Sequence, residues 1–372
     1  MISGMGKKIR VLVADDSAFM RRCLKDILES EKDIEVIDTA RDGREAVEKT
    51  LRLYPDVVTL DINMPHMDGL TALQHIMSLA PCPVVMISSL TTEGALATLE
   101  ALELGAVDFV AKPGGTVSLG IKQLASEIVA KVRTAAFSNR KSIGRVRFSR
   151  KSAGEIKRQD ESGKKNEARI LKNEIVVIIG VSTGGPKTLM EILPRLPSDF
   201  PGAVLVVQHM PPAFTESFAK RLDQYCDLPV REAGDGASVE PGTITVAKGG
   251  WHLVVERDAG KLALKARLTG KPEDALYKPS VNVTMKSVLE NMDGRNIIGV
   301  LLTGMGDDGA DMMVEIRKKG GFAIAESEET AVVYGMPKAA IERGGADIVA
   351  PAYKIGDIIL KKVNEYAKFS HK

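Results

Sequence analysis

Charged and hydroxyl side chains follow several short apolar runs in the first third of the chain. Two adjacent aspartates, Asp15 and Asp16, come directly after one run, Asp61 follows another, and Ser88 and Lys112 follow two more. Carboxylates that crowd together repel one another unless a cation neutralises them, and their oxygen atoms suit Mg²⁺. A carboxylate beside Mg²⁺ and an ammonium group could act as a nucleophile on a phosphoryl donor. Roles as turn formers or helix caps would explain single aspartates but not the whole set.

A second set of reactive side chains lies later in the sequence. Ser182 stands in a G-x-S-x-G pattern, Gly180–Gly184, that is typical of a nucleophile elbow between a strand and a helix. A serine hydroxyl is a poor nucleophile and needs a base that is held by an acid. His209 follows the next apolar run, and Asp307 and Asp308 follow a later one. The set predicts an acyl-transfer site in which N–H groups of the elbow bind an oxyanion.

Two other interpretations of this second set are weaker. A glycine-rich turn before a helix can cradle a phosphate, but the spacing is not G-x-G-x-x-G and the next strand ends in Gln208-His209 rather than in an acidic ribose ligand. Taken singly, Ser182 could cap a helix, His209 could be a buried structural residue and Asp308 a turn residue. Their joint occurrence after three predicted strands disfavours that interpretation. The order Ser, His, Asp also differs from the order Ser, acid, His of the α/β-hydrolase fold.

The elements that must position the first set alternate between strands and helices. The predicted strands are Ile9–Ala14, Ile34–Ala40, Val57–Leu60, Val84–Ile87 and Asp108–Ala111. Between them, apolar residues recur three and four positions apart, as expected for amphipathic helices. Five such units in about 130 residues predict a doubly wound parallel sheet, in which ligands lie beyond the carboxyl ends of the strands.

The second set belongs to a similar α/β pattern. The predicted strands are Glu174–Ile179, Ala203–Val207 and Ile297–Leu302. Helices are predicted to begin at Pro186 and Pro211. Alternating residues and a Pro-Gly pair in the segment from Val239 to Leu268 predict β-hairpins inserted in this second, doubly wound domain.

The sequence between the two patterns is basic. Residues 138–173 contain twelve Lys and Arg against four Asp and Glu, whereas the whole chain has a net charge of only +2. Few apolar residues occur there, so the segment predicts a solvated flexible linker, with a docking strip for an acidic partner or membrane surface as the alternative. The expected domains are therefore 1–137 and 174–368, joined by a linker at 138–173.

The composition limits the class of protein. With 44% hydrophobic and 27% charged residues, the chain is typical of globular proteins. The longest purely aliphatic run, Ile175–Ile179, is too short to cross a membrane and no signal-peptide core is found, so we expect a cytoplasmic protein without membrane insertion. Cys23, Cys82 and Cys226 have neither disulfide nor metal-site spacing. Aromatic residues make up 4% of the chain, and nucleic-acid binding is not expected.

The first set of residues resembles the response-regulator receiver domain. The resemblance rests on Val11–Ser17, Asp61–Gly69, Ser88 and Lys112-Pro113, which occur in this order at predicted strand ends. It implies a flavodoxin-like (βα)5 fold for residues 1–137.

The receiver resemblance also implies roles for single residues. Asp61 would be the phospho-acceptor, and Mg²⁺ would be held by Asp15, Asp16 and Asp61 together with the backbone carbonyl of Asn63. The phosphoryl-contacting and switch residues would be Lys112, Ser88 and Phe109.

The second set resembles the catalytic domain of the chemotaxis protein-glutamate methylesterases. The matching segments are Gly180–Pro186, Gln208–Pro211, Lys278–Val281 and Leu302–Gly309. One departure is Asn282, which stands where an aspartate would be expected.

This resemblance assigns a Ser-His-Asp triad. Ser182 would be the nucleophile, His209 the general base and Asp308 the acid that orients it. Asp308 is preferred over Asp307 because it matches the last aspartate of the family's T-G-M-G-x-D-G pattern. The oxyanion site would be shaped by Thr183 and by the backbone N–H of Met305.

Together the two resemblances imply a response regulator that is itself an enzyme. The expected function is a phosphorylation-activated methylesterase that removes methyl groups from glutamates of methyl-accepting chemotaxis receptors, releases methanol, and also deamidates receptor glutamines. Mg²⁺ would serve phosphorylation only, and the esterase chemistry would use no cofactor. The expected partners are the receptors and a chemotaxis histidine kinase, and the expected state is a monomer. The unphosphorylated receiver would lie over the triad, and phosphorylation would favour an open arrangement.

Two other functions fit part of the pattern. A response regulator with a DNA-binding or protein-interaction output would need a recognition element, but no helix-turn-helix pattern is found and the basic residues lie in the linker. A deamidase with little esterase activity would be distinguished by assays of methyl-ester and glutamine substrates side by side.

Overall fold

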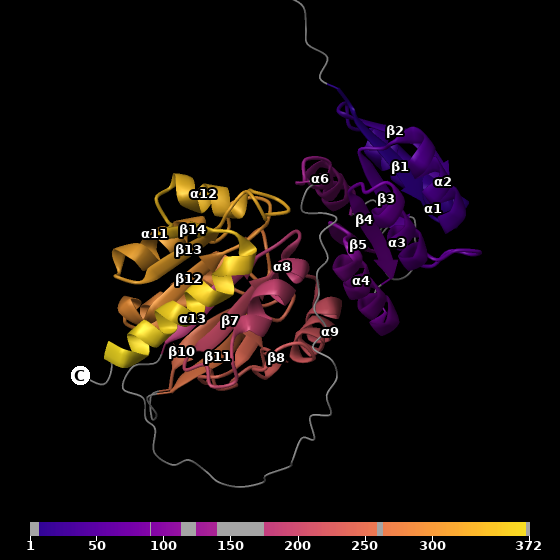
Figure 1. The fold of residues 1–372 in the computed structure, drawn as a ribbon. Helices are drawn as coiled ribbons and strands as arrows, with labels where there is room; N and C mark the ends of the chain where they lie inside the picture. The colour runs from indigo at the N-terminus through magenta and orange to yellow at the C-terminus, as the bar shows by residue number, and fades with distance from the viewer. Residues whose placement is uncertain (1–6, 90, 113–123, 140–174, 259–262, 370–372) are drawn as a thin grey trace, which may run out of the picture.

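A computed structural model describes residues 7–89, 91–112, 124–139, 175–258 and 263–369. The predicted linker therefore lies outside the described residues except for Ser138 and Asn139. Figure 1 shows two α/β domains, the first in indigo to magenta and the second in magenta to yellow. No helix in the described ranges is both long enough and apolar enough to cross a membrane.

The first domain has five parallel strands covered by helices. The strands are β1 (Ile9–Ala14), β2 (Ile34–Ala40), β3 (Val57–Asp61), β4 (Val84–Ser89) and β5 (Asp108–Lys112). The helices are α1 (Ala18–Glu29), α2 (Gly43–Leu53), α3 (Gly69–Leu79), α4 (Thr92–Leu104) and α6 (Ala125–Ala136). The strand order β2-β1-β3-β4-β5 is that of a flavodoxin-like sheet, so the predicted fold is confirmed.

Three strands of this domain run one or two residues further than the sequence pattern predicts. Asp61 pairs in register with Ile87, and Ser89 pairs with Lys112, so polar residues continue the parallel ladder where hydrophobicity has already ended. Asp61 and Lys112 are therefore the last residues of their strands rather than loop residues.

The second domain is built on seven parallel strands. Its main-sheet strands are β6 (Val176–Val181), β7 (Ala203–Gln208), β8 (Val230–Glu232), β9 (Ile244–Val246), β12 (Ile297–Leu301), β13 (Phe322–Glu326) and β14 (Ile348–Ala350). Their order is β14-β13-β12-β6-β7-β9-β8. The helices are α8 (Gly185–Ile192), α9 (Pro212–Asp223), α10 (Val281–Asn291), α11 (Ala310–Lys318), α12 (Met336–Glu342) and α13 (Ala352–Phe369), with 3₁₀ turns at Leu193–Arg195 and Gly294–Asn296.

The segment predicted as inserted β-hairpins divides into two parts. Strands β10 (His252–Arg257) and β11 (Leu264–Thr269) form a separate antiparallel pair, as predicted. Strand β9 instead joins the main sheet, where it runs parallel to β7 and β8. The alternating pattern of Thr243–Ala247 could not tell these cases apart, because a short strand near a sheet edge has one buried face in either arrangement.

Both sheets reverse their strand order beside the first strand of each domain. The chain places β2 on one side of β1 and β3 on the other, and it places β7 on one side of β6 and β12 on the other. At this reversal the chain continues from neighbouring strands to opposite sides of the sheet, which leaves a crevice at the carboxyl ends of these strands. Ligands bind in this crevice in sheets of this type.

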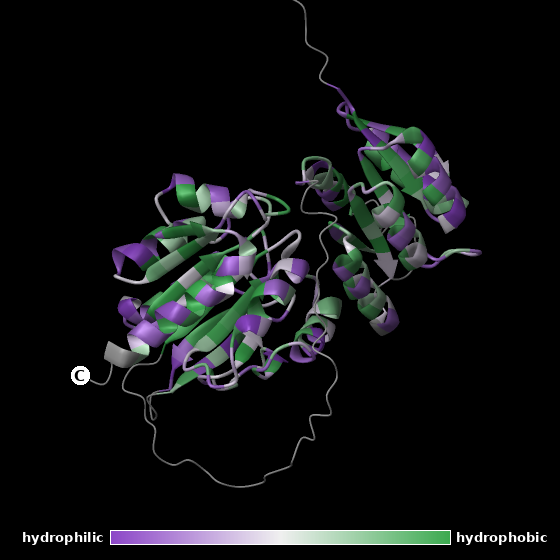
Figure 2. Ribbon diagram, viewed as in Figure 1, coloured by the Kyte–Doolittle hydropathy of each residue, from purple (hydrophilic) through white to green (hydrophobic). Residues whose placement is uncertain are grey.

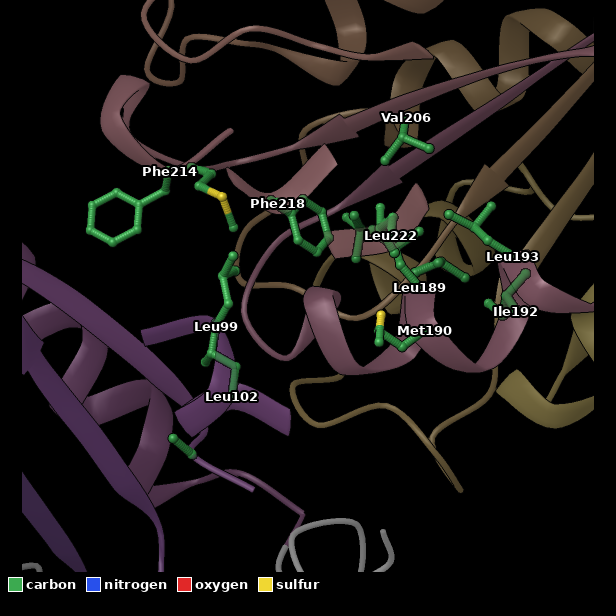
Figure 3. Packing of buried hydrophobic residues seen from close by; sticks show 14 of the residues in the cluster. Leu99, Leu102, Leu189, Met190, Ile192, Leu193, Val206, Phe214, Phe218 and Leu222 are labelled. Carbon is green, nitrogen blue, oxygen red and sulfur yellow. The ribbon is translucent and has the colours of Figure 1, made fainter. Parts of the chain in front are cut away.

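Apolar side chains fill the space between the sheets and their helices. Figure 2 shows the hydrophobic colours concentrated on the strands and on the helix faces that cover them. One buried cluster continues from the first domain into the second, because α4 packs against α8 and α9. Figure 3 shows Leu99 and Leu102 of α4 beside the face of α9 that carries Phe214 and Phe218.

The start of α3 fits closely against the end of β3. A Cβ atom at Gly69 would lie 2.0 Å from the carbonyl oxygen of Asp61. We therefore expect Gly69→Ala to lower the free energy of unfolding by about 1–3 kcal/mol, because backbone cannot yield as a flexible side chain can. Gly270→Ala is the control, since nothing lies within 4 Å of a Cβ there. Thermal unfolding of both variants checks this, and equal stability of the two would contradict it.

Candidate functional site

The crevice of the first domain gathers the predicted acidic residues. Carboxylate oxygens of Asp15, Asp16 and Asp61 all lie within 4.8 Å of one another. The Nζ atom of Lys112 lies 3.0 Å from Asp15 Oδ2 and 2.9 Å from Asp61 Oδ2. An all-oxygen cluster of this kind fits a hard divalent cation such as Mg²⁺. Asn63 is exposed two residues beyond Asp61, and its predicted role as a backbone ligand stays a prediction.

Burial determines the electrostatics of this crevice. Desolvation and the negative charge of Asp15 raise the pKa of Asp61, whereas Lys112 lowers it. Together these effects raise the pKa of Asp61 to about 6. Burial lowers the pKa of Lys112, and the two carboxylates more than offset that effect, so that its pKa is raised overall. The lysine is therefore held as a cation between two acids.

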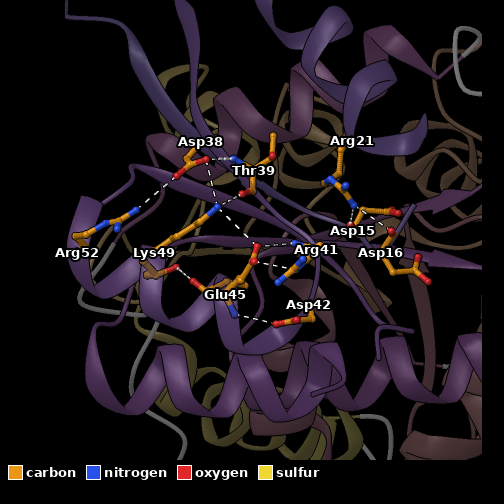
Figure 4. Close-up of polar contacts among 12 residues, drawn as sticks. Asp15, Asp16, Arg21, Asp38, Thr39, Arg41, Asp42, Glu45, Lys49 and Arg52 are labelled. Carbon is orange, nitrogen blue, oxygen red and sulfur yellow. Dashed lines mark hydrogen bonds and ion pairs between the residues drawn. The ribbon is translucent and has the colours of Figure 1, made fainter. Parts of the chain in front are cut away.

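One residue of this site has no clear signal in the sequence. Arg21, in the first turns of α1, donates from Nη1 to the backbone oxygens of Asp15 and Asp16, at 2.7 and 3.0 Å (Figure 4). The same figure shows a separate surface network in which Lys49 contacts Asp38 and Glu45. Arg21 holds the loop after β1, whereas the surface network has no contact with the acidic cluster among the interactions drawn.

Two of the residues predicted for phosphoryl contact and switching, Ser88 and Phe109, contact α4 and the second domain. The hydroxyl of Ser88 donates to the backbone oxygen of Gly94 at 3.1 Å and accepts from Thr98 at 2.6 Å, so it is engaged with α4. The ring of Phe109 lies 4.5 Å, centroid to centroid, from that of Phe214 in the second domain. Both side chains thus connect β4 and β5 to the interface between the domains.

Three neighbouring strands of the second domain, β12, β6 and β7, lead to the predicted triad residues, and two of these, His209 and Asp308, are in direct contact. Val181 at the end of β6 pairs with Gln208 at the end of β7, so Ser182 and His209 stand at matching positions beyond the sheet. The Nε2 atom of His209 lies 2.9 Å from Asp308 Oδ2. The side chains of His209 and Asp308 are only 7% and 9% exposed, which shields their interaction from water.

The loop around Ser182 is fixed by the strand on its other side. The N–H of Ser182 donates to the backbone oxygen of Thr303 at 2.9 Å, and Thr303 Oγ1 donates to the backbone oxygen of Thr183, also at 2.9 Å. A Cβ atom at Gly304 would lie 2.7 Å from that of Ser182, so only glycine permits this approach. The segment Leu302–Gly309 thus supports Ser182 as well as carrying Asp308.

The carboxylate of Asp308 is held by the start of α10. Oδ1 accepts from Ser280 Oγ and from the N–H of Asn282, each at 3.0 Å, and Oδ2 accepts from the N–H of Val281 at 2.7 Å. Burial raises the pKa of Asp308, but the hydrogen bonds and the nearby His209 lower it below its usual value. The matching segment Lys278–Val281 therefore has a physical role, which is to begin the helix that keeps Asp308 ionised.

The adjacent aspartate has a different environment. Asp307 is 62% exposed and forms an ion pair with Arg343. It has no interaction with His209 among the described residues. The geometry therefore separates two residues that the sequence pattern alone could rank only by position in a motif.

Both residues predicted to shape the oxyanion site contact the first domain. Thr183 Oγ1 donates to Asp108 Oδ2 at 2.5 Å, and the sulfur of Met305 lies 2.9 Å from the hydroxyl oxygen of Thr134 in α6. Neither contact has a signal in the sequence, because each joins residues from different domains. Nearby, Arg221 of α9 forms a paired ionic contact with Glu103 of α4 at 2.7 Å.

Another unpredicted residue lies directly against the histidine. The ring of Tyr277 stacks on His209 with a centroid distance of 4.0 Å and an interplanar angle of 11°. Burial raises the pKa of Tyr277, and the charges of Asp308 and Asp307 raise it further, so the phenol stays neutral. Its position one residue before the matching segment Lys278–Val281 is the only hint that the sequence offers.

Fold and site together define a class of protein, a receiver domain packed on a domain with a Ser-His-Asp arrangement. Comparisons with known proteins identify the family of each of the two domains. A CheB methylesterase family model matches residues 177–359, and a response regulator receiver domain model matches residues 11–121. The chain belongs to the family of CheB protein-glutamate methylesterases/protein-glutamine glutaminases, which confirms the family resemblance predicted from the sequence.

Individual relatives are similar over nearly the whole chain. The protein-glutamate methylesterase/protein-glutamine glutaminase of Caldanaerobacter subterraneus subsp. tengcongensis is 75% identical over 366 residues, which cover 98% of this chain and 100% of the relative. The second such protein of Carboxydothermus hydrogenoformans is 55% identical over 96% of this chain and 99% of its own length. The solved Thermotoga maritima CheB methylesterase catalytic domain is 42% identical, with a TM-score of 0.49, over 51% of this chain and 98% of that domain.

The different environments of the adjacent aspartates give a direct test. We expect Asp308→Asn to lower turnover of glutamate methyl esters by about 10³–10⁴-fold, because the asparagine cannot stabilise a protonated His209. Asp307→Asn is the matched control and should keep turnover within about threefold. Methanol release from methylated substrate measures the turnover of both variants. A large loss in the Asp307 variant alone would show that Asp307, not Asp308, is the acid.

Proposed function

We propose that Ser182, His209 and Asp308 carry the esterase and glutaminase activity of this family member, and that Asp61 controls it. The chain is a receiver-bearing methylesterase by family, and the substrates named for its relatives are protein glutamate methyl esters and glutamines. The observation that carries the proposal is the pairing of His209 with Asp308 beside Ser182, at the ends of three adjacent strands.

The hydrogen bonds of His209 indicate which nitrogen exchanges the proton. Nε2 is occupied by Asp308, whereas the buried Nδ1 has no hydrogen-bond partner among the described residues. Nδ1 would take the proton of Ser182 as Oγ bonds to the ester carbonyl carbon. It would then return that proton to the leaving methoxide as the C–O bond breaks, which releases methanol.

Water completes the reaction by the same route. His209 Nδ1 takes a proton from a water molecule, whose oxygen attacks the acyl carbon, and then returns the proton to Ser182 Oγ as the acyl bond breaks. A glutamine side chain would follow the same steps with ammonia as the leaving group. Thr183 and the backbone N–H of Met305 would stabilise the oxyanion in both cases.

The receiver domain implies Mg²⁺-dependent phosphorylation, and the acidic crevice has the ligands for it. Asp15, Asp16, Asp61 and the backbone carbonyl of Asn63 would hold the ion, whose charge offsets that of the incoming phosphoryl group. Asp61 Oδ would bond to phosphorus as the donor's leaving group departs. Lys112, which already contacts Asp61, would then pair with the new phosphoryl oxygens.

Contacts between the domains support control by occlusion. Asp108 engages Thr183, the residue after the nucleophile, and Thr134 contacts Met305. Both residues that would shape the oxyanion site are thus bound to the receiver. Phosphorylation at Asp61, through Ser88 on β4 and Phe109 on β5, would favour an arrangement in which these contacts are released.

The family also suggests partners for this chain. Members act with chemoreceptors and a kinase in general, and we propose methyl-accepting receptors as substrate and a chemotaxis histidine kinase as phosphodonor for this chain. We also propose a cytoplasmic monomer with domains at 1–137 and 174–368 and a linker at 138–173.

Paired variants test the proposal. Ser182→Ala should lower methanol release from methylated receptor by about a thousandfold or more, with or without phosphodonor. Asp61→Asn should keep the basal rate but lose its increase with acetyl phosphate and Mg²⁺. Normal turnover in the serine variant, or normal activation in the aspartate variant, would contradict the corresponding half of the proposal.

The contact between Asp108 and Thr183 gives a further prediction. Asp108→Ala should raise the unphosphorylated rate by about fivefold or more, because it removes a hydrogen bond that holds Thr183 to the receiver domain. Glu127→Ala is the control, since Glu127 pairs with Lys131 on the same domain without reaching Thr183. Equal basal rates in both variants and the parent would show that this contact does not restrain the enzyme.

A further inference from the structure

A buried histidine outside the triad lies behind the helix start that holds Asp308. His252, the first residue of β10, is fully buried. Its Nδ1 accepts the backbone N–H of Ser280 at 3.2 Å, and its Nε2 lies 3.2 Å from the backbone oxygen of Pro272. The imidazole therefore connects three separate segments, β10, the turn at Pro272 and the residue before α10.

The partners of His252 define its protonation. Because Ser280 supplies an N–H donor, Nδ1 must be unprotonated, and the ring proton must lie on Nε2, where it is donated to Pro272. Burial lowers the pKa of His252, which keeps the imidazole neutral. The residue is thus a fixed acceptor rather than a group that exchanges protons.

Ser280 joins this acceptor to the catalytic site. Its backbone N–H is bound to His252, while its Oγ donates to Asp308 and accepts the N–H of Val283 as the helix cap. Three of the four donors to Asp308 come from residues 280–282. A rotation of the backbone at Ser280 would therefore displace most of what orients the carboxylate.

The rest of α10 is bound to β10 elsewhere, which isolates the role of His252. Thr284 Oγ1 donates to the backbone oxygen of Leu253 at 2.7 Å, and Ser287 Oγ accepts the N–H of Val255 at 3.0 Å. These contacts fix the body of the helix against the strand. At the start of the helix, Ser280 is the N-cap of α10. Among the described residues, His252 alone accepts the backbone N–H of Ser280.

We infer that His252 is a positioning residue for the esterase, which fixes Ser280 and through it the orientation of Asp308 toward His209. This inference rests on the proposed triad. His252 has no part in proton transfer and does not touch the substrate. Its loss should therefore affect turnover rather than substrate binding.

Two amide variants separate this role from simple packing. An asparagine places its amide oxygen near the position of Nδ1, whereas a glutamine places its amide near Nε2 and leaves Ser280 without an acceptor. In the phosphorylated full-length chain, His252→Gln should lower kcat for methylated receptor about tenfold or more, with KM within about twofold. His252→Asn should retain kcat within about threefold.

Controls make each outcome decisive. Thermal unfolding measures whether both variants fold, and packing alone would affect them equally. Equal kcat losses, a loss confined to KM, or full turnover in His252→Gln would overturn the inference. In the Asp308→Asn background, His252→Gln should lower kcat by less than about a further twofold, because His252 acts on catalysis only through Asp308. Full turnover of Asp308→Asn by itself would instead overturn the triad.

Discussion

Buried carboxylates have to be compensated, and the way each one is compensated determines what it can do. Asp308 accepts four hydrogen bonds and has a lowered pKa, so it is a permanent anion suited to orient an imidazole. Asp61 has one ammonium partner, Lys112, and one backbone N–H donor, Ile62, but it lies beside the carboxylates of Asp15 and Asp16, and burial raises its pKa to about 6. Glu326 accepts two hydrogen bonds among the described residues, from Thr303 and Thr330, and burial raises its pKa to about 7. By this comparison, a cation would still be needed to neutralise the cluster around Asp61, whereas the charge of Asp308 is already compensated by its donors.

The interface between the domains combines apolar packing with a few polar contacts to the catalytic loops. Leu99 and Leu102 of α4 pack on α9. This apolar contact stabilises the interface but does not fix the relative orientation of the two domains. The hydrogen bond from Thr183 to Asp108 fixes the orientation, because it joins the residue after the proposed nucleophile to the first residue of β5. Phe109, next in that strand, contacts Phe214 across the interface. A change in β5 can therefore reach the catalytic loop through adjacent residues.

Much of the architecture could be predicted because it depends on local patterns. Strands β1 and β2 begin and end where the hydrophobic runs do, and the reactive residues stand directly after such runs. The prediction was less accurate where polar residues continue a ladder, as at Asp61, and where a short alternating strand, β9, could join either of two sheets. Strand pairing at those places depends on the neighbouring strand, which a single segment does not specify.

The sequence by itself determined the fold class, the family and the residue types that could do the chemistry, because motifs and periodicity are local properties of the chain. Tertiary structure alone decided which of two adjacent aspartates faces His209, since Asp307 turns to Arg343 while Asp308 turns to the start of α10. It also decided that Thr183 and Met305 contact the receiver, that Tyr277 stacks on His209, and that His252 accepts the N–H of Ser280. These relations join segments far apart in sequence, and hydrogen bonds across such distances exist only once the sheets and domains have assembled.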